Sequence, residues 1–417
     1  MNTLHTADAD QYPADHAHAG KSFKGATLAV AMSVFLNVAG FTLIIPVVPF
    51  LIGRYVPSSR IGLLVGLIVS IYAACSFFAA PVLGALSDRF GRRPILVLSL
   101  LGSAVGYVIF GIGGALWVLF AGRIIDGLTA GNISTMFAYV ADTTAPAERG
   151  RVYGLLGAVG GLGFMLGPVA GGLLGAIQPT MPLFAAALLT IVNIAWVCLA
   201  MPESVAPGRA RPALTWRHLD PLAPLSRALG IATLRSAFAA AFLFFFAGAM
   251  LQSNLAVYLK DVLDLGPGGI GWILFGVGVM DIVSQGVLAR TLLPYVDARV
   301  LARSGLVVNA VGFALIAATT LVPHAGFLLG AIMVFALGDG LFQPSVSGMI
   351  ANAAPADAQG LVQGANQAQQ ALARMLGPLL GALLYSFGAG APYWAGAGVA
   401  LAAAVVLGVG GREPERT

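Results

Sequence analysis

Long apolar runs divide this sequence, and they constrain its fold more than any other feature. Each run holds about twenty or more residues with almost no charge, and short polar intervals separate the runs. Because a helix rises about 1.5 Å per residue, roughly 20 residues cross a hydrocarbon core about 30 Å thick. The sequence therefore predicts twelve membrane-spanning helices, near residues 25–51, 61–86, 94–113, 116–141, 152–175, 182–201, 233–258, 268–289, 300–320, 326–350, 362–386 and 393–411.

The composition agrees with a lipid environment. The chain is 58% hydrophobic and 9% charged, with a mean hydropathy of +0.89, whereas soluble domains carry about 25% charged residues. Inside lipid the backbone has no water partners, so helices are the default spanning structure. The alternating pattern of a membrane barrel does not occur in the runs. We predict an all-α integral membrane protein.

The basic residues predict the orientation of the helices. If the N-terminus is cytoplasmic, only Arg54, Arg60 and Lys260 of the 22 Lys and Arg residues lie in outside intervals. Arg123 and Arg374 lie within apolar runs, and the remaining basic residues lie in cytoplasmic intervals. Because Lys and Arg accumulate on the cytoplasmic side, we predict that both termini are cytoplasmic. The basic residues are scattered over many short loops, which argues against nucleic-acid binding.

The longest polar interval separates two similar halves. The pattern Ala-Pro-Ala-acid, later followed by Met-Leu-Gly-Pro-x-x-Gly, occurs over residues 145–171 and again over 354–381. Two six-helix repeats in the same orientation place a substrate site near the membrane midplane between them. The predicted organisation is a cytoplasmic tail, a first bundle, a cytoplasmic linker, and a second bundle with a short C-terminal tail, at residues 1–24, 25–201, 202–232 and 233–417.

A charge-dense segment, Gly84–Pro94, connects the second and third runs. Gly91 permits a tight turn, and Asp88 is placed to cap the helix that follows. Arginines donate hydrogen bonds to carboxylates, and Asp142 at the end of the fourth run is the best-placed partner. The alternative is a basic loop that only fixes the orientation. We predict a gating motif that consists of Gly84, Asp88, Arg89, Gly91, Arg92, Arg93 and Asp142.

The fifth run carries a second motif, Gly163-x-x-x-Gly167-Pro168-x-x-Gly171-Gly172. The four-residue spacing lines its glycines along one face, which permits close approach of a neighbouring helix. Pro168 lacks an N–H group and favours a bend. A role limited to helix packing is the alternative to a role in transport.

Together these motifs resemble those of the major facilitator superfamily. Gly84–Pro94 resembles the loop between that family's second and third helices, and the glycine motif is similar to that of its drug–proton antiporters. Arg123-x-x-Asp126-Gly127 is similar to a third motif, whose arginine is linked to proton coupling, with Asp126 where the family usually has Gln. The resemblance covers the whole chain and is closest to the twelve-helix branch of tetracycline–proton antiporters, through residues 44–49 and 80–94.

This resemblance implies two pseudo-symmetric six-helix bundles that work by alternating access. The implied activity is proton-coupled efflux of lipophilic drugs or antibiotics, multidrug or tetracycline-like, across a bacterial inner membrane. Tetracycline exporters carry aspartates within helices 1, 3 and 9, and the aligned positions here are Asn37, Gly106 and Asn309. Tetracycline as the substrate, and the family's own proton site, therefore stay open.

Three acidic residues within the apolar runs are candidates for proton coupling. A charge at bilayer depth costs at least about 2.5–3.5 kcal/mol, so such residues usually face a cavity and have a function. Asp339 has no local partner and is the first candidate, and Asp281 is the second. Arg123 lies three residues before Asp126, so this pair can be structural. Arg374 is a possible counter-ion for Asp339 or Asp281, and a structural hydrogen-bonding role is the alternative for each acid.

The predicted substrate surface is apolar and aromatic, with a few amides. Such a surface suits amphipathic organic molecules better than sugars or phosphates, and no buried cluster of basic residues is present to hold an anion. Lipid contact or core packing is the alternative for each phenylalanine. The predicted substrate-binding residues are Asn37, Phe41, Phe245, Met250, Gln252, Asn254, Phe342, Gln343 and Gln367.

The leading hypothesis is a proton-driven drug exporter that functions as a monomer. Its expected partners are a small lipophilic substrate, protons and the lipid bilayer, with no cofactor and no metal site. The second hypothesis is an exporter of an endogenous metabolite, such as a sugar, lipid or siderophore. The third is a membrane sensor that does not transport. An enzyme is the weakest hypothesis, because no nucleophile constellation or metal cluster occurs in the sequence.

Overall fold

All regular secondary structure in the described part of the chain is helical. The computed structural model describes residues 16–205, 220–285, 289–292, 294–354 and 359–409, so parts of both predicted tails and of the predicted linker lie outside it. The elements are α1 (His16–Leu43), η1 (Ile45–Val47), α2 (Val48–Ile52), α3 (Ser58–Phe90), α4 (Arg92–Ile112), α5 (Leu116–Leu128), α6 (Asn132–Thr143), α7 (Pro146–Ile177), α8 (Met181–Ala200), α10 (Ala223–Ala228), α11 (Ala232–Leu263), α12 (Pro267–Val283), α13 (Ala289–Leu292), α14 (Ala298–Ala318), α15 (Ala325–Ala353), α16 (Gln359–Tyr385) and α17 (Ala391–Val409).

The predicted apolar runs correspond to these helices in order. Within the described residues, nine helices are long and apolar enough to cross a membrane. The remaining three predicted runs differ in kind: α12 is shorter, the fourth run is divided into α5 and α6, and α16 carries a row of polar side chains. Helix α1 begins at His16, so it extends into the predicted polar tail.

The division of the fourth run corrects the prediction of one continuous helix over residues 116–141. The backbone turns between α5 and α6, where the Gly131 N–H group donates to the Thr129 carbonyl oxygen at 2.8 Å. A Cβ atom at Gly131 would lie 2.8 Å from the Leu83 side chain on α3, so a glycine is needed for this approach. Close packing of α3 against the turn therefore accompanies the break.

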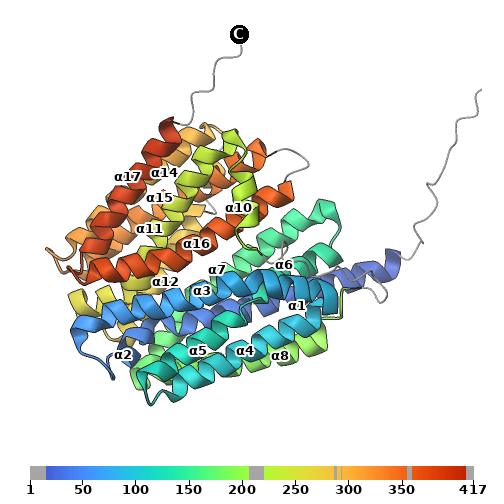
Figure 1. Cartoon of the computed structure of the whole chain (residues 1–417), viewed down its shortest axis with the longest axis horizontal. Coiled ribbons are helices and arrows are strands. Elements are labelled where there is room, and N and C mark those ends of the chain that lie inside the picture. Colours follow the sequence, from blue (N-terminus) through green and yellow to red (C-terminus); the bar gives the residue numbers. More distant parts are fainter. Residues whose placement is uncertain (1–15, 206–219, 286–288, 293, 355–358, 410–417) are drawn as a thin grey trace, which may run out of the picture.

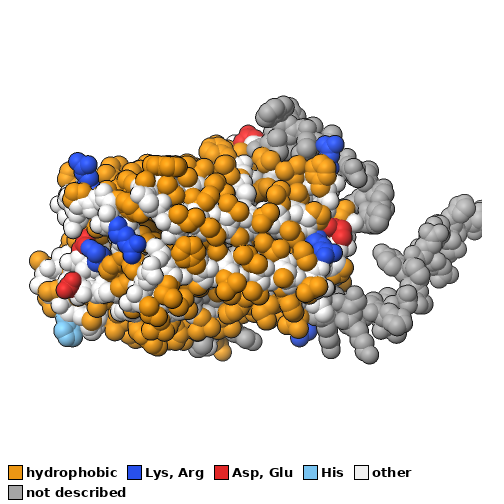
Figure 2. Space-filling model, turned by 90° about the horizontal axis from the view of Figure 1, so that it is seen from below, with side chains coloured by type: hydrophobic (Ala, Val, Ile, Leu, Met, Phe, Trp, Pro, Cys, Tyr) orange, Lys and Arg blue, Asp and Glu red, His pale blue; other side chains and the backbone are white. Residues whose placement is uncertain are grey.

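The helices form two groups that follow one another along the chain (Figure 1). In the first group α1 packs against α7 and α8, and α4 packs against α5 and α8. In the second group α14 packs against α15 and α17, and α11 packs against α16 and α17. Figure 2 shows hydrophobic side chains over the long side of the molecule, with charged side chains mostly toward its two ends. This distribution fits a protein whose middle faces lipid.

The two groups touch through α3 with α16 and through α7 with α12. A Cβ atom at Gly62, near the start of α3, would lie 2.6 Å from the Tyr385 ring at the end of α16. A Cβ atom at Gly172, near the end of α7, would lie 2.6 Å from the Pro267 carbonyl oxygen at the start of α12. In contrast, a Cβ atom at Gly154, near the start of α7, would have no neighbour within 4 Å. The halves therefore meet closely at the end of the molecule opposite Gly84–Pro94.

Candidate functional site

The segment between α3 and α4 turns at Gly91. This residue has φ 110° and ψ 152°, a conformation that favours glycine. Its N–H group donates to the Ser87 carbonyl oxygen at 3.1 Å. A Cβ atom at Gly91 would also lie 2.5 Å from a carboxylate oxygen of Glu203. The tight turn predicted at Gly91 is thus present, and the Glu203 side chain, which follows α8, packs against it.

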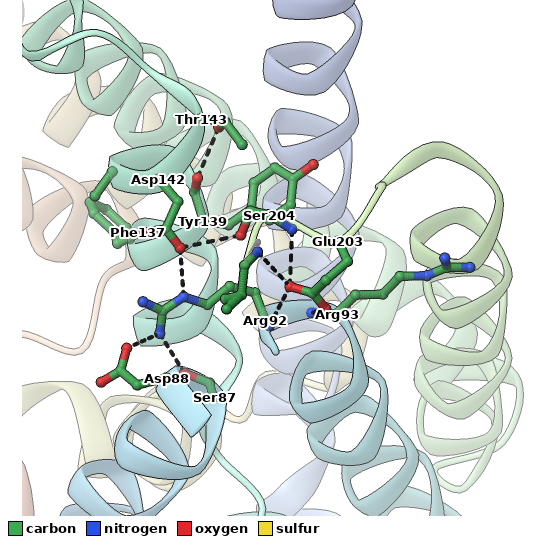
Figure 3. A network of polar contacts seen from close by, with 12 residues as sticks. Ser87, Asp88, Arg92, Arg93, Phe137, Tyr139, Asp142, Thr143, Glu203 and Ser204 are labelled. Carbon is green, nitrogen blue, oxygen red and sulfur yellow. Dashed lines mark hydrogen bonds and ion pairs between the residues drawn. The ribbon is translucent and has the colours of Figure 1, made fainter. Parts of the chain in front are cut away.

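Arg92 joins four segments of the first group (Figure 3). Its Nε atom donates to Asp142 on α6 at 2.8 Å, and one terminal nitrogen lies 2.5 Å from Asp88 on α3. The same nitrogen donates to the Ser87 hydroxyl at 2.7 Å, and the Ser204 hydroxyl donates to Asp142 at 3.2 Å. Arg92 is only 8% exposed. The arginine predicted to bind a carboxylate therefore binds two of them, and Asp142 is the partner named from the sequence.

The cap of α4 differs from the predicted one. Asp88 does not cap this helix, because it lies in the last turn of α3 and its carboxylate binds the Arg92 guanidinium. Instead, the Glu203 carboxylate accepts from the backbone N–H groups of Arg92 at 2.9 Å and Arg93 at 3.1 Å. A carboxylate at a helix N-terminus satisfies free donors and complements the helix dipole. The sequence analysis did not identify this cap. Its only signal in the sequence was that Glu203 is an acid just after the apolar run of α8.

The other predicted gating residues lie at the edge of this arrangement. The Arg93 side chain donates to the Cys198 carbonyl oxygen, and the Arg89 guanidinium lies 5.5 Å from the centre of the Phe90 ring. A Cβ atom at Gly84 would have no neighbour within 4 Å. Arg92, Asp88, Asp142 and Glu203 therefore form the connected centre of the segment.

The glycine motif of α7 packs against two neighbours. A Cβ atom at Gly163 would lie 3.0 Å from the Phe35 carbonyl oxygen, and one at Gly167 would lie 2.8 Å from the Ala39 carbonyl oxygen, both on α1. Gly171 faces the same helix, at Leu43. This close approach was predicted from the four-residue spacing.

The opposite side of the motif faces the second half of the chain. A Cβ atom at Gly271 on α12 would lie 2.5 Å from the Pro168 carbonyl oxygen. Gly172 also approaches α12, since a Cβ atom at this position would lie 3.0 Å from the Cα atom of Gly271. Pro168 and Gly172 thus belong to the contact between the halves, whereas the other glycines pack within the first half.

A buried charged group lies at the centre of the first half. Arg123 and Asp126 on α5 are 4% and 2% exposed and form an ion pair of 2.8 Å. The Arg123 guanidinium lies 4.2 Å from the centre of the Tyr72 ring on α3 and 5.7 Å from that of Phe41 on α1. The rings of Phe41 and Tyr72 are 5.5 Å apart. The sequence predicted the pair of Arg123 and Asp126, but it assigned Phe41 to the substrate surface and did not identify Tyr72, which is marked in the sequence only as an aromatic residue among small ones.

Asp126 also explains the glycine at position 106. A Cβ atom at Gly106 on α4 would lie 2.8 Å from the Asp126 Cβ atom and 2.7 Å from the Gly122 carbonyl oxygen. A larger side chain at position 106 would therefore collide with α5. Asn309, another aligned position, donates to the Phe335 carbonyl oxygen at 3.3 Å between α14 and α15 and is 1% exposed.

Two further acids lie together in the second half. Asp339 on α15 is 9% exposed, accepts from the Gln343 amide at 3.0 Å, and interacts electrostatically with Asp281 on α12. The Asp281 Oδ1 atom is buried without a hydrogen-bond partner among the described residues. Each acid lies 14 residues from the first residue of its helix, so both lie at a similar depth, about 21 Å from that end.

Arg374 is not the counter-ion of either acid in this structure. It forms no ion pair with Asp339 or Asp281, and its electrostatic neighbour is Tyr72 on α3. The reason is its position on α16, which packs against α3 rather than beside the two acids. The pairing predicted for Arg374 is therefore corrected.

Several predicted substrate-binding residues are part of the packed core. Met250 and Asn254 are 0% exposed where α11 meets Gly381 of α16, and Phe342 is 0% exposed with its ring 4.3 Å from that of Phe244. These side chains occupy helix contacts and do not line an open surface. The other predicted residues are half-buried or exposed: Asn37, Phe41, Phe245, Gln252, Gln343 and Gln367.

Known proteins are similar to this chain over most of its length. The family model of the Major Facilitator Superfamily matches residues 30–296 and 237–417. Tetracycline resistance protein, class C, from Escherichia coli is 33% identical over 382 residues, which are 92% of this chain and 94% of that protein. The class B protein from Escherichia coli is 29% identical, over 87% of this chain and 88% of that protein.

Two solved transporter structures are similar to the chain over most of its length. The human organic anion transporter MFSD10 (TETRAN) has a TM-score of 0.70 and 25% identity, over 92% of this chain and 99% of that one. The nucleoside transporter NupG has a TM-score of 0.75 and 13% identity, over 93% of this chain and all of that one. The second likeness concerns the fold alone.

Proposed function

The chain belongs to the major facilitator superfamily, and from this premise we propose that it exports amphipathic organic molecules, drugs or antibiotics among them, in exchange for protons. It is a multi-pass membrane protein with the fold of a transporter rather than an enzyme. The proposed location is a bacterial inner membrane, with both termini in the cytoplasm. The tetracycline resistance proteins with which it aligns support the export of an antibiotic-like substrate.

The observation that carries proton coupling is the buried pair Asp281 and Asp339. Two neighbouring carboxylates repel each other when both are ionised, so such a pair readily shares a proton. Asp281 has an oxygen without a hydrogen-bond partner among the described residues, which leaves it able to receive that proton. A proton that enters down a potential of 100 mV supplies about 2.3 kcal/mol, enough to concentrate a substrate about 50-fold if the exchange is one to one.

The proposed cycle alternates between two arrangements of the halves, residues 25–201 and 233–417. In the arrangement described above, the close contacts lie near the start of α3 and the end of α7. A substrate would then enter from the opposite end, which is the proposed cytoplasmic side. The Arg92 cluster lies at that end, and we propose that it stabilises the first half when that side closes.

Drug-driven proton release from proteoliposomes tests this proposal. We expect Asp339→Asn to abolish proton release while the variant still binds substrate, because an amide cannot exchange a proton. Asp264→Asn is the matched control: it makes the same chemical change at an exposed residue after α11. If Asp339→Asn leaves proton release unchanged, Asp339 is not the coupling residue. If Asp281→Asn also leaves it unchanged, the pair does not couple proton movement to transport.

A second candidate function is export of an endogenous organic anion. The likeness to the human organic anion transporter MFSD10 favours it, since that protein is similar in sequence as well as in fold. A deletion strain separates the two candidates. Greater drug susceptibility supports drug export, whereas intracellular accumulation of an acidic metabolite with unchanged susceptibility supports the second candidate.

A further inference from the structure

Helix α16 packs against two neighbours through two rows of small residues. Gly377 and Gly381 face α11, since their Cβ atoms would lie 2.8 Å from the Phe246 carbonyl oxygen and 3.2 Å from the Met250 Cα atom. Pro378 and Ala382 face α3, where they contact Gly66. In the last two turns of α16, α11 therefore covers the first row and α3 covers the second.

The exposed side chains of α16 form an apolar side and a polar side, and the polar side continues the row of Gly377 and Gly381 toward the start of the helix. The exposed apolar side chains on this helix are Leu376, Leu380 and Leu383. A polar row recurs at spacings of three and four residues and consists of Gln363, Gln367, Gln370 and Arg374. At about 100° per residue, this row lies on the side of the helix opposite the leucines. The leucines thus face lipid, and the polar row faces the interior between the halves.

The polar row is open to solvent. Gln363, Gln367 and Arg374 are exposed, and Gln370 is half-buried. Amide and guanidinium groups at this depth need water or a polar partner, because hydrocarbon supplies neither. The row therefore borders a water-accessible space that leads from the end of the molecule where the halves separate.

Arg374 lies at the inner limit of this space. Pro378, one turn farther along α16, packs against Gly66 of α3, so Arg374 lies one turn before this close contact between the two halves. Figure 1 shows α3 and α16 side by side in the middle of the molecule. Arg374 lies 11 residues before the end of α16 at Tyr385, about 16 Å from that end. The side chain is thus placed near the middle of the membrane.

Arg374 has no bonded partner, in contrast to Arg123 and Asp339. Arg123 is paired with Asp126, and Asp339 accepts from Gln343. Arg374 forms no hydrogen bond or ion pair within the described residues, and its nearest electrostatic neighbour is Tyr72. An unpaired charge inside a membrane protein is costly and marks a functional site. Its free guanidinium offers up to five donors in a planar fork that fits a carboxylate.

We propose that Arg374 binds an anionic group of the transported molecule, so that the substrate class is the amphipathic organic anion. The aromatic pair Phe41 and Tyr72, which lies across from α16 on the first half, receives the apolar body of the molecule. This inference rests on the proposed function and revises the expectation that nothing here would hold an anion. A cluster of basic residues is unnecessary, because a single guanidinium forms strong charge-assisted hydrogen bonds with a carboxylate.

The test is equilibrium binding to the full chain in lipid nanodiscs. The probes are three pyrene derivatives that share one ring system and end in a carboxylate, a neutral primary amide or a quaternary ammonium group. We expect the wild type to bind the carboxylate about tenfold more tightly than the amide, as for a charge-assisted hydrogen bond. Arg374→Gln should bind both with equal affinity, and Arg374→Lys should keep part of the preference.

Two controls keep the result interpretable. Arg303→Gln makes the same change at an exposed arginine on α14 and should leave the preference intact. Unchanged binding of the neutral amide by Arg374→Gln shows that the variant is folded. Equal binding of all three probes by the wild type, or a preference that survives in Arg374→Gln, would overturn the anion site.

This outcome is separable from that of the proposed function. Binding is measured without a proton gradient, so a preference lost in Arg374→Gln supports the anion site even if no probe is transported. Proton-driven flux of all three probes at equal rates, without a preference in binding, supports export and refutes the anion site.

Discussion

Removing the Glu203 carboxylate should loosen the start of α4 and with it the Arg92 cluster. Its Oε1 atom accepts from the Arg92 N–H group at 2.9 Å and its Oε2 atom from the Arg93 N–H group at 3.1 Å. Loss of a helix cap costs about 0.5–2 kcal/mol, and a carboxylate near a helix N-terminus adds about 0.3–1 kcal/mol. Because Glu203 is exposed, we expect Glu203→Ala to cost about 1 kcal/mol, toward the lower end of that range.

Amide hydrogen exchange measures this effect where it occurs. An opening free energy lowered by about 1.4 kcal/mol raises the exchange rate about tenfold. We therefore expect exchange at Arg92 and Arg93 to rise between about fivefold and tenfold in Glu203→Ala. Glu203→Gln should raise it mainly at Arg93, because the amide keeps one acceptor oxygen for Arg92 and turns its donor group toward Arg93.

Glu148→Ala is the matched control for this experiment. Glu148 is also an exposed acid in the first turn of a helix, α7, but it accepts no hydrogen bond from a described residue. The Glu148→Ala variant should change amide exchange in α7 slightly and leave the exchange rates of Arg92 and Arg93 unchanged. The cap assignment is refuted if Glu203→Ala leaves exchange at these two amides unchanged, or if Glu148→Ala raises it equally.

Two further predictions concern the glycines at close contacts. Gly91→Ala should lower the free energy of unfolding by about 1–2 kcal/mol, because its φ of 110° is strained for alanine and its Cβ atom would meet Glu203; a thermal unfolding midpoint equal to that of the wild type contradicts this. Gly172→Leu should reduce substrate flux strongly, because its side chain would separate α7 from Pro267 and Gly271 of α12. Gly157→Leu, where a Cβ atom meets nothing within 4 Å, is its control, and equal flux in the two variants would refute a role for this contact in transport.

The helices were predictable because each one is encoded locally. A run of about twenty apolar residues can only be satisfied across a membrane, and the starts and ends of α3, α4 and α8 lie within a few residues of the predicted limits. The break between α5 and α6 was missed, because the run stays apolar across it and the packing of Leu83 against Gly131 involves another helix. The partner of Arg92 was predictable as well, since Asp142 ends a neighbouring run and few other acids lie on that side.

The faces of the helices were less predictable. Met250 and Phe342 were assigned to the substrate surface from residue type, but they are packed inside the second half. Helices that are apolar on all sides have no preferred face in the sequence, so residue type alone cannot separate lining from packing. The polar row of α16 that ends at Arg374 is the exception. Its polar residues recur at helical spacing in the sequence, and the exposed leucines on the opposite side of the helix show which side faces lipid.

By itself the sequence determined that this is a helical membrane protein and where its motifs lie, and it predicts two repeated halves and the membrane side of the basic loops. These properties follow from the cost of placing charge and unpaired backbone groups in hydrocarbon, which acts on each segment separately. The tertiary structure alone decided that Glu203 caps α4, that Tyr72 lies on Arg123, and that Arg374 stands apart from Asp339. These contacts join residues far apart in the chain, and a helix rotation of about 100°, one residue, is enough to make or remove each of them.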